Sequence, residues 1–255
     1  METPRTTGLS GTALKWAAIV TMLVDHIGGT LLLSLYYQQM NEMSRGIYYA
    51  ARVVGRVAFP IFCFLLVEGF AHTRSRGKYA LRLGAFALVS EIPFDIAFNR
   101  PENGFLELDS QNVFFTLLLG LLALWLWAAL AERVPQGWGY LTLLPAALPC
   151  YLAAEALKTD YASFGVLLIV ALGAGRGLPG QEPARRNRIL QLIMGSAAIL
   201  YYCSSRGRWI EVYAILGLAA CLRYNGERGR GGKWFFYVFY PAHLLVLGLV
   251  NRALF

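Results

Sequence analysis

The sequence predicts an all-α polytopic integral membrane protein, a single-domain bundle over residues 1–255 with about nine transmembrane helices and a cytoplasmic N-terminus. Three observations predict this fold. Hydrophobic residues make up 57% of the 255 residues and charged residues 15%, and the mean hydropathy of +0.49 is too high for a soluble domain of this length. Most apolar runs approach the roughly 20 residues that cross a bilayer core of about 30 Å as a helix. Lys and Arg divide unequally between alternate connections.

The predicted spans follow one another with short connections. The first has no cleavage pattern in front of it and is long enough to remain as a helix. The second is as long, Pro93 is expected to kink the third, and the fourth is strongly apolar. Pro145 and Pro149 interrupt the fifth and the sixth is short, so eight or ten spans also fit the region from the fifth to the eighth. The nine segments are residues 13–36, 47–71, 79–98, 112–131, 138–156, 161–175, 187–205, 209–223 and 233–254.

The orientation follows from the basic residues. Of the 23 Lys and Arg residues, all except Arg52 and Arg56 lie in or beside the connections. Fifteen of these 21 residues lie on one side of the membrane and six on the other. Because Lys and Arg accumulate in cytoplasmic loops, the N-terminus is predicted to lie in the cytoplasm and the C-terminus outside.

Composition and motifs exclude several classes of function. In a membrane protein, cytoplasmic loops account for a net charge of +8, so no nucleic-acid partner is expected. The four cysteines have no metal or redox spacing and are interpreted as packing residues. No Walker loop, GxGxxG motif or zinc-ligand spacing is present. ATP-driven chemistry and a metal cofactor therefore have no support in the sequence.

Ionisable residues inside the spans are the strongest functional signal. A charge near the bilayer centre costs about 2.5–3.5 kcal/mol on insertion scales, so each needs a partner, a cavity or a purpose. Asp25 and His26 lie about 12 residues into the first span, and Arg52 and Arg56 share one face of the second. The others are Glu68, His72, Glu91, Asp95, Asn112, Glu155 and His243. We interpret the set as the lining of a polar cavity; a structural ion network that fixes the helix register is the alternative.

His26 carries the clearest chemical suggestion, because an imidazole near a carboxylate suits a general base. Adjacent helix residues point about 100° apart. Asp25 therefore either orients His26 or pairs with an arginine, in which case Glu91 or Asp95 orients the imidazole. For His243 the sequence leaves two interpretations open, helix packing and a place in the cavity wall.

A cluster of cations follows the second span. Its residues are anchors of the cytoplasmic side, a site for phosphate groups, or both, since Arg offers bidentate donors and Lys a compact charge. They are His72, Arg74, Arg76, Lys78 and Arg82.

Several strings in the first half of the chain resemble the TraX family, bacterial inner-membrane proteins associated with N-terminal acetylation of conjugative pilin. The resemblance is close over about residues 13–122, is thinner afterwards, and says little about 132–158 and 173–230. The strings that carry it are TMLVDHIG at 21–28, GRVAFPIF at 55–62, EGFAHTR at 68–74, SEIPFD at 90–95 and QNVFFT at 111–116, followed by YASFGV at 161–166 and FYPAH at 239–243.

The resemblance implies a multi-pass acyltransferase of the inner membrane that takes acetyl-CoA from the cytosol. The expected acceptor is an amine or hydroxyl at the outer face, the pilin N-terminus by family precedent or an envelope polymer. The implied catalytic residues are His26 as general base with Asp25, Glu91 and Asp95, and transfer is either direct or through an acetyl-histidine. Arg52 and Arg56 would stabilise an oxyanion or hold an acidic acceptor group. With these two arginines, the implied substrate-binding set includes Glu68, Asn112 and His243. The implied acetyl-CoA site consists of His72, Arg74, Arg76, Lys78 and Arg82.

Two other functions fit the same residues. A proton-coupled transporter also uses carboxylates, histidine and arginines across neighbouring spans, but it would carry inverted repeats with matching broken helices. The sequence shows no convincing counterpart to the Pro93 break in an inverted repeat. A structural assembly factor would tolerate neutral replacements of the buried charges. The expected partners are the lipid bilayer, acetyl-CoA and an acceptor whose identity the sequence does not give. Small-residue helix faces leave the oligomeric state open.

Overall fold

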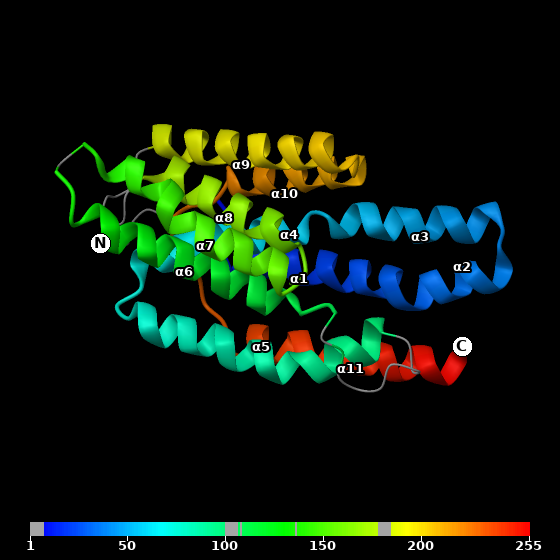
Figure 1. The fold of residues 1–255 in the computed structure, drawn as a ribbon. Helices are drawn as coiled ribbons and strands as arrows, with labels where there is room; N and C mark the ends of the chain where they lie inside the picture. The colour runs from blue at the N-terminus through cyan, green and yellow to red at the C-terminus, as the bar shows by residue number, and fades with distance from the viewer. Residues whose placement is uncertain (1–7, 100–106, 108, 136, 178–184) are drawn as a thin grey trace, which may run out of the picture.

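The computed structural model describes residues 8–99, 107, 109–135, 137–177 and 185–255. Within these ranges the chain is a helical bundle (Figure 1). Its elements are α1 (Gly11–Ile27), the π-helix η1 (Gly28–Leu32), α2 (Leu33–Gln39), α3 (Glu42–Gly55), α4 (Ala58–His72), α5 (Arg76–Phe98), α6 (Val113–Ala131), the 3₁₀ turn η3 (Gly139–Thr142), α7 (Leu143–Ala156), α8 (Ala162–Arg176), α9 (Arg185–Arg206), the 3₁₀ turn η4 (Trp209–Tyr213), α10 (Ala214–Cys221) and α11 (Lys233–Leu254).

The predicted all-α membrane fold is confirmed, and among the described residues helices occupy all nine predicted segments. Within the described ranges, four helices are long and apolar enough to cross a membrane: Gly11–Gln39, Glu42–His72, Val113–Ala131 and Trp234–Leu254. Ala162–Arg176 and Trp209–Cys221 are apolar but shorter. Nine crossings and the orientation of the chain therefore stay predictions. Pro93 does not end its helix, because α5 continues from Arg76 to Phe98.

The helices form a central group with a pair on either side (Figure 1). In the central group α6, α7 and α8 pack on one another and α4 packs on α1 and α8. The pair α9 and α10 covers one side through contacts of α9 with α8 and of α10 with α4, and the pair α5 and α11 lies on the opposite side. Fully buried side chains such as Phe64, Leu121 and Ile169 fill the space between these layers.

Connections gather at the two ends of the bundle. At one end the N-terminal segment lies beside the connection after α10, where the Leu9 amide donates to the Arg223 carbonyl at 2.7 Å. At the other end the connection after α5 meets the one after α7, where the Gln111 amide donates to the Lys158 carbonyl at 3.1 Å. We call the second the Asp160 end, after a residue of that connection.

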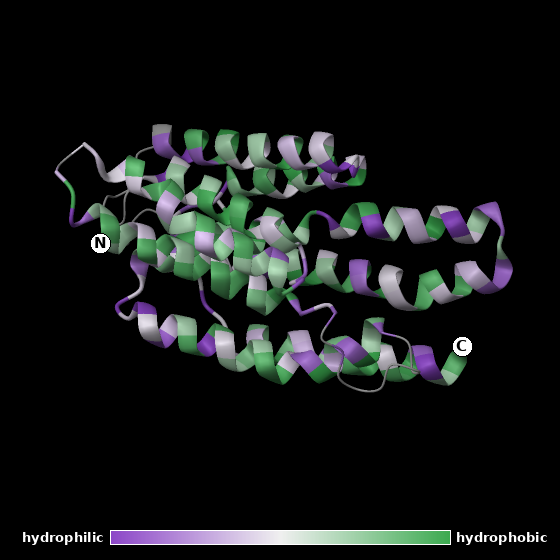
Figure 2. Ribbon diagram, viewed as in Figure 1, coloured by the Kyte–Doolittle hydropathy of each residue, from purple (hydrophilic) through white to green (hydrophobic). Residues whose placement is uncertain are grey.

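The outer surface of the helices is apolar. Figure 2 shows hydrophobic residues along the lengths of the helices and hydrophilic residues concentrated at their ends and connections. Leu81 and Leu88 on α5, Leu144 on α7 and Ile193 on α9 are all more than half exposed. Such a surface is stable in lipid and unfavourable in water. The protein is a membrane protein, with its polar side chains directed inward or toward the ends.

Candidate active site

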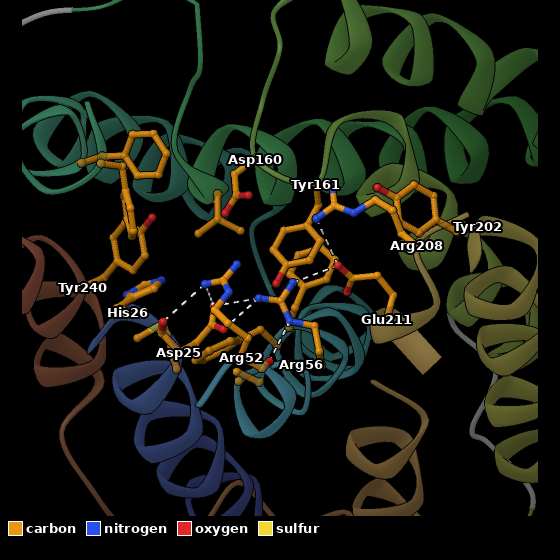
Figure 3. A pocket seen from close by; sticks show the side chains of 18 residues that line it. Asp25, His26, Arg52, Arg56, Asp160, Tyr161, Tyr202, Arg208, Glu211 and Tyr240 are labelled. Carbon is orange, nitrogen blue, oxygen red and sulfur yellow. Dashed lines mark hydrogen bonds and ion pairs between the residues drawn. The ribbon is translucent and has the colours of Figure 1, made fainter. Parts of the chain in front are cut away.

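A cavity of about 210 Å³ lies inside the bundle toward the Asp160 end, where α1, α3, α4 and α5 meet the connections after α7 and α9 (Figure 3). Phe59, Phe62, Phe94 and Phe98 provide much of its apolar wall. Its polar lining consists of Asp25, His26, Arg52, Arg56, Asp160, Tyr161, Tyr202, Arg208, Glu211 and Tyr240. Four residues predicted from the sequence, Asp25, His26, Arg52 and Arg56, therefore meet in one cavity.

Arg56 is the centre of a buried ion network. Its Nη2 donates to both Asp25 carboxylate oxygens at 2.8 and 2.9 Å, and its Nη1 donates to Glu211 Oε1 at 2.9 Å. Its Nε donates to the Arg52 carbonyl at 3.2 Å. Only 4% of the Arg56 side chain is exposed, so both carboxylates are neutralised almost out of contact with solvent. Arg208 adds a longer contact of 3.5 Å to Glu211.

Arg52 differs from Arg56 in having donors to spare. Its Nη1 lies 3.0 Å from Asp25 Oδ2 and 3.3 Å from the Asp25 carbonyl. In the described part of the chain no partner is seen for its Nε or Nη2, and Figure 3 shows its guanidinium group directed into the cavity. Of the two predicted arginines, Arg52 is thus the one able to bind a further molecule.

Two local features of the backbone make room for these charges. At Gly55 on α3 a Cβ atom would overlap the carboxylate of Asp25, so the helix can pass the ion pair only because no side chain is there. The π-helix at Gly28–Leu32 begins two residues after His26. Single π turns of this kind often occur at functional sites because they change which side chains share a face.

His26 contacts a histidine and none of the three carboxylates that the sequence offered as its partner, Asp25, Glu91 or Asp95. The Nδ1 of His26 lies 2.6 Å from Nε2 of His243 on α11. The ring planes differ by 4°, and the centroid separation of 4.9 Å is almost twice the nitrogen separation. The rings therefore meet edge to edge in nearly one plane, which is the geometry of an N–H···N hydrogen bond.

The next contact assigns the tautomers. His243 Nδ1 lies 2.7 Å from the carbonyl oxygen of Phe239, which can only accept, so Nδ1 of His243 carries a proton. When His243 is neutral, its Nε2 must accept from Nδ1–H of His26. The proton on Nδ1 leaves Nε2 of His26 as the unprotonated nitrogen, available to a molecule in the cavity. His243 thus supports His26 from behind and is not itself part of the polar lining.

Asp95, Glu91 and Asn112 lie outside the cavity lining and organise the connection between α5 and α6. Asp95 accepts from Asn99 Nδ2 at 2.7 Å and from the Glu107 amide at 2.9 Å. Glu91 accepts from the amide and side chain of Asn112, whose Nδ2 also donates to the Ala87 carbonyl at 2.7 Å. Asn112 in addition caps α6. These hydrogen bonds hold the connection between α5 and α6, whereas the other carboxylate oxygen of Glu91, Oε1, is buried without a hydrogen-bond partner among the described residues.

The predicted residues of the cytoplasmic side gather at the opposite end of α4. Glu68 lies twelve residues after Arg56, about 18 Å along the helix axis. It pairs with Arg176 of α8 at 3.0 Å and lies 3.6 Å from His72. Among the described residues, no side chain from 63 to 93 lines the cavity, so the structure does not bring this group to His26. The same is true of Arg74, Arg76, Lys78 and Arg82.

Sequence reasoning missed three ionisable residues of the cavity. Glu211 lies at the start of the eighth predicted span, Arg208 directly precedes that span, and Asp160 lies between the fifth and sixth, so all three resembled ordinary span boundaries. The useful signal was a carboxylate inside an apolar run at Glu211. Burial raises the pKa of Asp160 to about 6, against the opposing effect of Arg56. In the described ranges, no group of three or more His, Cys, Asp or Glu is arranged to hold a metal ion.

Comparison with known proteins places this site in a family. The chain is 30% identical over 259 residues to the probable fimbrial assembly protein FimC, serogroup H1, of Dichelobacter nodosus, and the match covers 95% of this chain and 96% of the relative. No solved structure matches it significantly. The family model described as TraX protein matches residues 10–251, which include every residue of the cavity. The chain therefore belongs to the TraX family.

Proposed function

We propose that this protein is an acyltransferase of the bacterial cytoplasmic membrane, which moves an acetyl group from cytosolic acetyl-CoA to an amine or hydroxyl at the outer face. The observation that carries the proposal is the contact of His26 Nδ1 with His243 beside a polar cavity, because it assigns the unprotonated nitrogen of a neutral His26 to Nε2. A general base needs such a nitrogen within reach of the nucleophile. Because the relative is a probable fimbrial assembly protein, pilin is the first acceptor to test.

The chemistry can be written with the residues of the cavity. The acceptor nitrogen or oxygen attacks the thioester carbonyl carbon, and Nε2 of His26 takes the proton that it loses. The free donors of Arg52 stabilise the oxyanion of the tetrahedral intermediate. Collapse of the intermediate breaks the carbon–sulfur bond, and the proton passes from His26 to the coenzyme A thiolate. Arg56 acts differently, since its donors hold Asp25 and Glu211 in place.

The donor would bind from the side opposite to the Asp160 end. The cations from His72 to Arg82 could hold its phosphates, since Arg74 and Lys78 are exposed. Buried side chains of α4, among them Phe64 and Val67, separate these cations from the cavity. We therefore expect the acetyl-bearing arm to enter between helices that part when the donor binds.

Replacement of His26 tests the proposal. With purified protein, labelled acetyl-CoA and a peptide from the N-terminus of a pilin, we expect His26→Gln and His26→Ala to lower transfer by about 10²- to 10⁴-fold, the usual contribution of a general base. Labelled peptide is measured by mass spectrometry, and acetyl-CoA binding and thermal stability serve as controls. Transfer at the parental rate by a folded variant would remove His26 from the mechanism.

The tautomer assignment gives a second prediction. In His243→Phe, His26 loses the acceptor for its Nδ1 proton, so we expect kcat to fall about 10-fold or more while the KM for acetyl-CoA stays the same. His243→Gln keeps an acceptor oxygen and should retain more activity. Nitrogen NMR of labelled histidine in the parent should show His26 protonated at Nδ1. Protonation of the neutral ring at Nε2 would contradict the assignment.

A further inference from the structure

The connection between α7 and α8 has an unusual backbone for its sequence. Lys158, Tyr161 and Ala162 have φ angles of 51°, 63° and 43°, the left-handed region that favours glycine. Non-glycine residues adopt it at a cost of about 1–3 kcal/mol each and keep it only where the surroundings enforce it. Three such residues within five positions indicate that this turn has a required shape.

Neighbouring residues hold the turn in that shape. The Asp160 amide donates to the Gln111 carbonyl at 2.6 Å, and the Gln111 amide in turn donates to the Lys158 carbonyl. The hydroxyl of Thr116 is within hydrogen-bond distance of the Thr159 hydroxyl and of the Asp160 carbonyl. The Tyr161 ring stacks on Phe59, with centroids 3.7 Å apart. Gln111 and Thr116 thus hold the main chain of the turn, and Phe59 holds the Tyr161 ring.

This arrangement directs Asp160 into the cavity, where it is the carboxylate left without a cationic partner. Asp25 and Glu211, the other two cavity carboxylates, are both held by Arg56. Within the described ranges no ion pair is seen for the Asp160 side chain, which accepts a hydrogen bond from the neighbouring Tyr161 amide. Figure 3 shows it on the opposite side of the cavity from His26 and Arg52. A half-buried carboxylate of this kind provides a place for a cation of the ligand.

We propose that Asp160 is the acceptor-binding residue of this site, that it holds the acceptor by a protonated amino group, and that it thereby selects an amine over a hydroxyl. The proposal rests on the acyltransferase function proposed above. The bound ammonium group first loses one proton to solvent by way of the Asp160 carboxylate. The neutral amine then attacks the thioester and loses its second proton to His26, which passes it to the thiolate. The products are the amide, coenzyme A and one released proton.

The test compares two synthetic peptides, the first ten residues of a mature pilin and the same peptide with its α-amino group replaced by hydroxyl. We expect Asp160→Asn to weaken equilibrium binding of the amine peptide by about 10- to 100-fold, as for loss of a charged hydrogen bond. Binding of the hydroxyl peptide and the KM for acetyl-CoA should not change. Asp160→Glu should restore part of the affinity. Asp109→Asn is the matched control, since Asp109 is exposed and contacts Lys158 outside the cavity.

The pH dependence gives a readout that a structural role would not move. Since the pKa of Asp160 is about 6, its charge, and with it the affinity of the parent for the amine peptide, should fall as the pH drops through 6. In Asp160→Asn the affinity should not change over that range. The comparison between the two proteins is needed because other titratable or charged groups face the carboxylate. They are Asp25, His26, Arg52, Arg56, Tyr161, Arg208, Glu211 and Tyr240.

Binding and transfer separate the two proposals. The role of Asp160 would be overturned, whatever the transfer rate, if the parent bound the two peptides with equal affinity. It would also be overturned if Asp160→Asn lowered the affinity for both peptides equally. Binding that depends on Asp160 in a parent that transfers no acetyl group would instead support the role of Asp160 and overturn the proposed function.

Discussion

Replacement of Arg56 by leucine should destabilise the folded protein by about 3–5 kcal/mol, the range found when one partner of a buried ion pair is removed. The reason is that two buried carboxylates would lose their closest cation and, among the described residues, would keep only the contact of Asp25 with Arg52 and the longer contact of Glu211 with Arg208. Asp25 accepts a hydrogen bond from Nη2 of Arg56 and Glu211 accepts one from Nη1. Neither carboxylate is exposed enough for water to replace those donors. The free energy of unfolding can be measured by titration of the protein in mixed micelles with a denaturing detergent.

A second arginine gives the matched control. Arg45 pairs with Glu42 at 2.7 Å at the start of α3, but both side chains are more than half exposed. Exposed pairs contribute little, so Arg45→Leu should change the stability by less than about 1 kcal/mol. Arg56→Lys should fall between the two, because a single ammonium group cannot reproduce the forked contacts with two carboxylates. Equal stability of the Arg56 and Arg45 variants would show that the buried network does not hold the bundle together.

The sequence was most informative where the signal is local. Runs of apolar residues predicted nine segments, and helices occupy all nine among the described residues, because each helix must cover its own backbone with side chains that lipid or the core can accept. Because a lone charge in a span is costly, the sequence also indicated that Asp25 needs a partner and offered an arginine as one candidate. The structure shows Asp25 paired with Arg56. These inferences depend on the residue and its neighbours along the chain, which are visible in the sequence.

Contacts between distant segments were not predictable in the same way. His26 and His243 are 217 positions apart, and which of His243, Glu91 or Asp95 supports His26 depends on how α11 and α5 pack on α1. Glu91 and Asp95 appeared functional because they are charged and lie in a span, yet the amides of a connection use them. Asp160 appeared unremarkable because it lies in a connection. Only the fold shows that this connection closes over the cavity.

Gly55→Ala should destabilise the protein more than the addition of one methyl group usually does. The Cβ would overlap the Asp25 carboxylate, which is held against Arg52 and Arg56 and has little room to withdraw. Overpacking alone typically costs about 1–3 kcal/mol, and displacement of Asp25 would also weaken the ion pairs beside His26. We expect Gly55→Ala to lose at least about 3 kcal/mol of stability when both effects are combined, and to lose most acetyl transfer.

Gly46 on the same helix provides the control, because a Cβ there meets no atom within 4 Å. Gly46→Ala should stabilise the protein by about 0.5–1 kcal/mol, since alanine loses less backbone freedom in a helix than glycine does. The two substitutions add the same atom to the same helix and differ only in what it meets. Opposite signs would assign the cost at Gly55 to the ion pair. A Gly55→Ala protein as stable and active as the Gly46→Ala protein would show that Asp25 can leave its arginines without consequence, and the arrangement around His26 would then need another explanation.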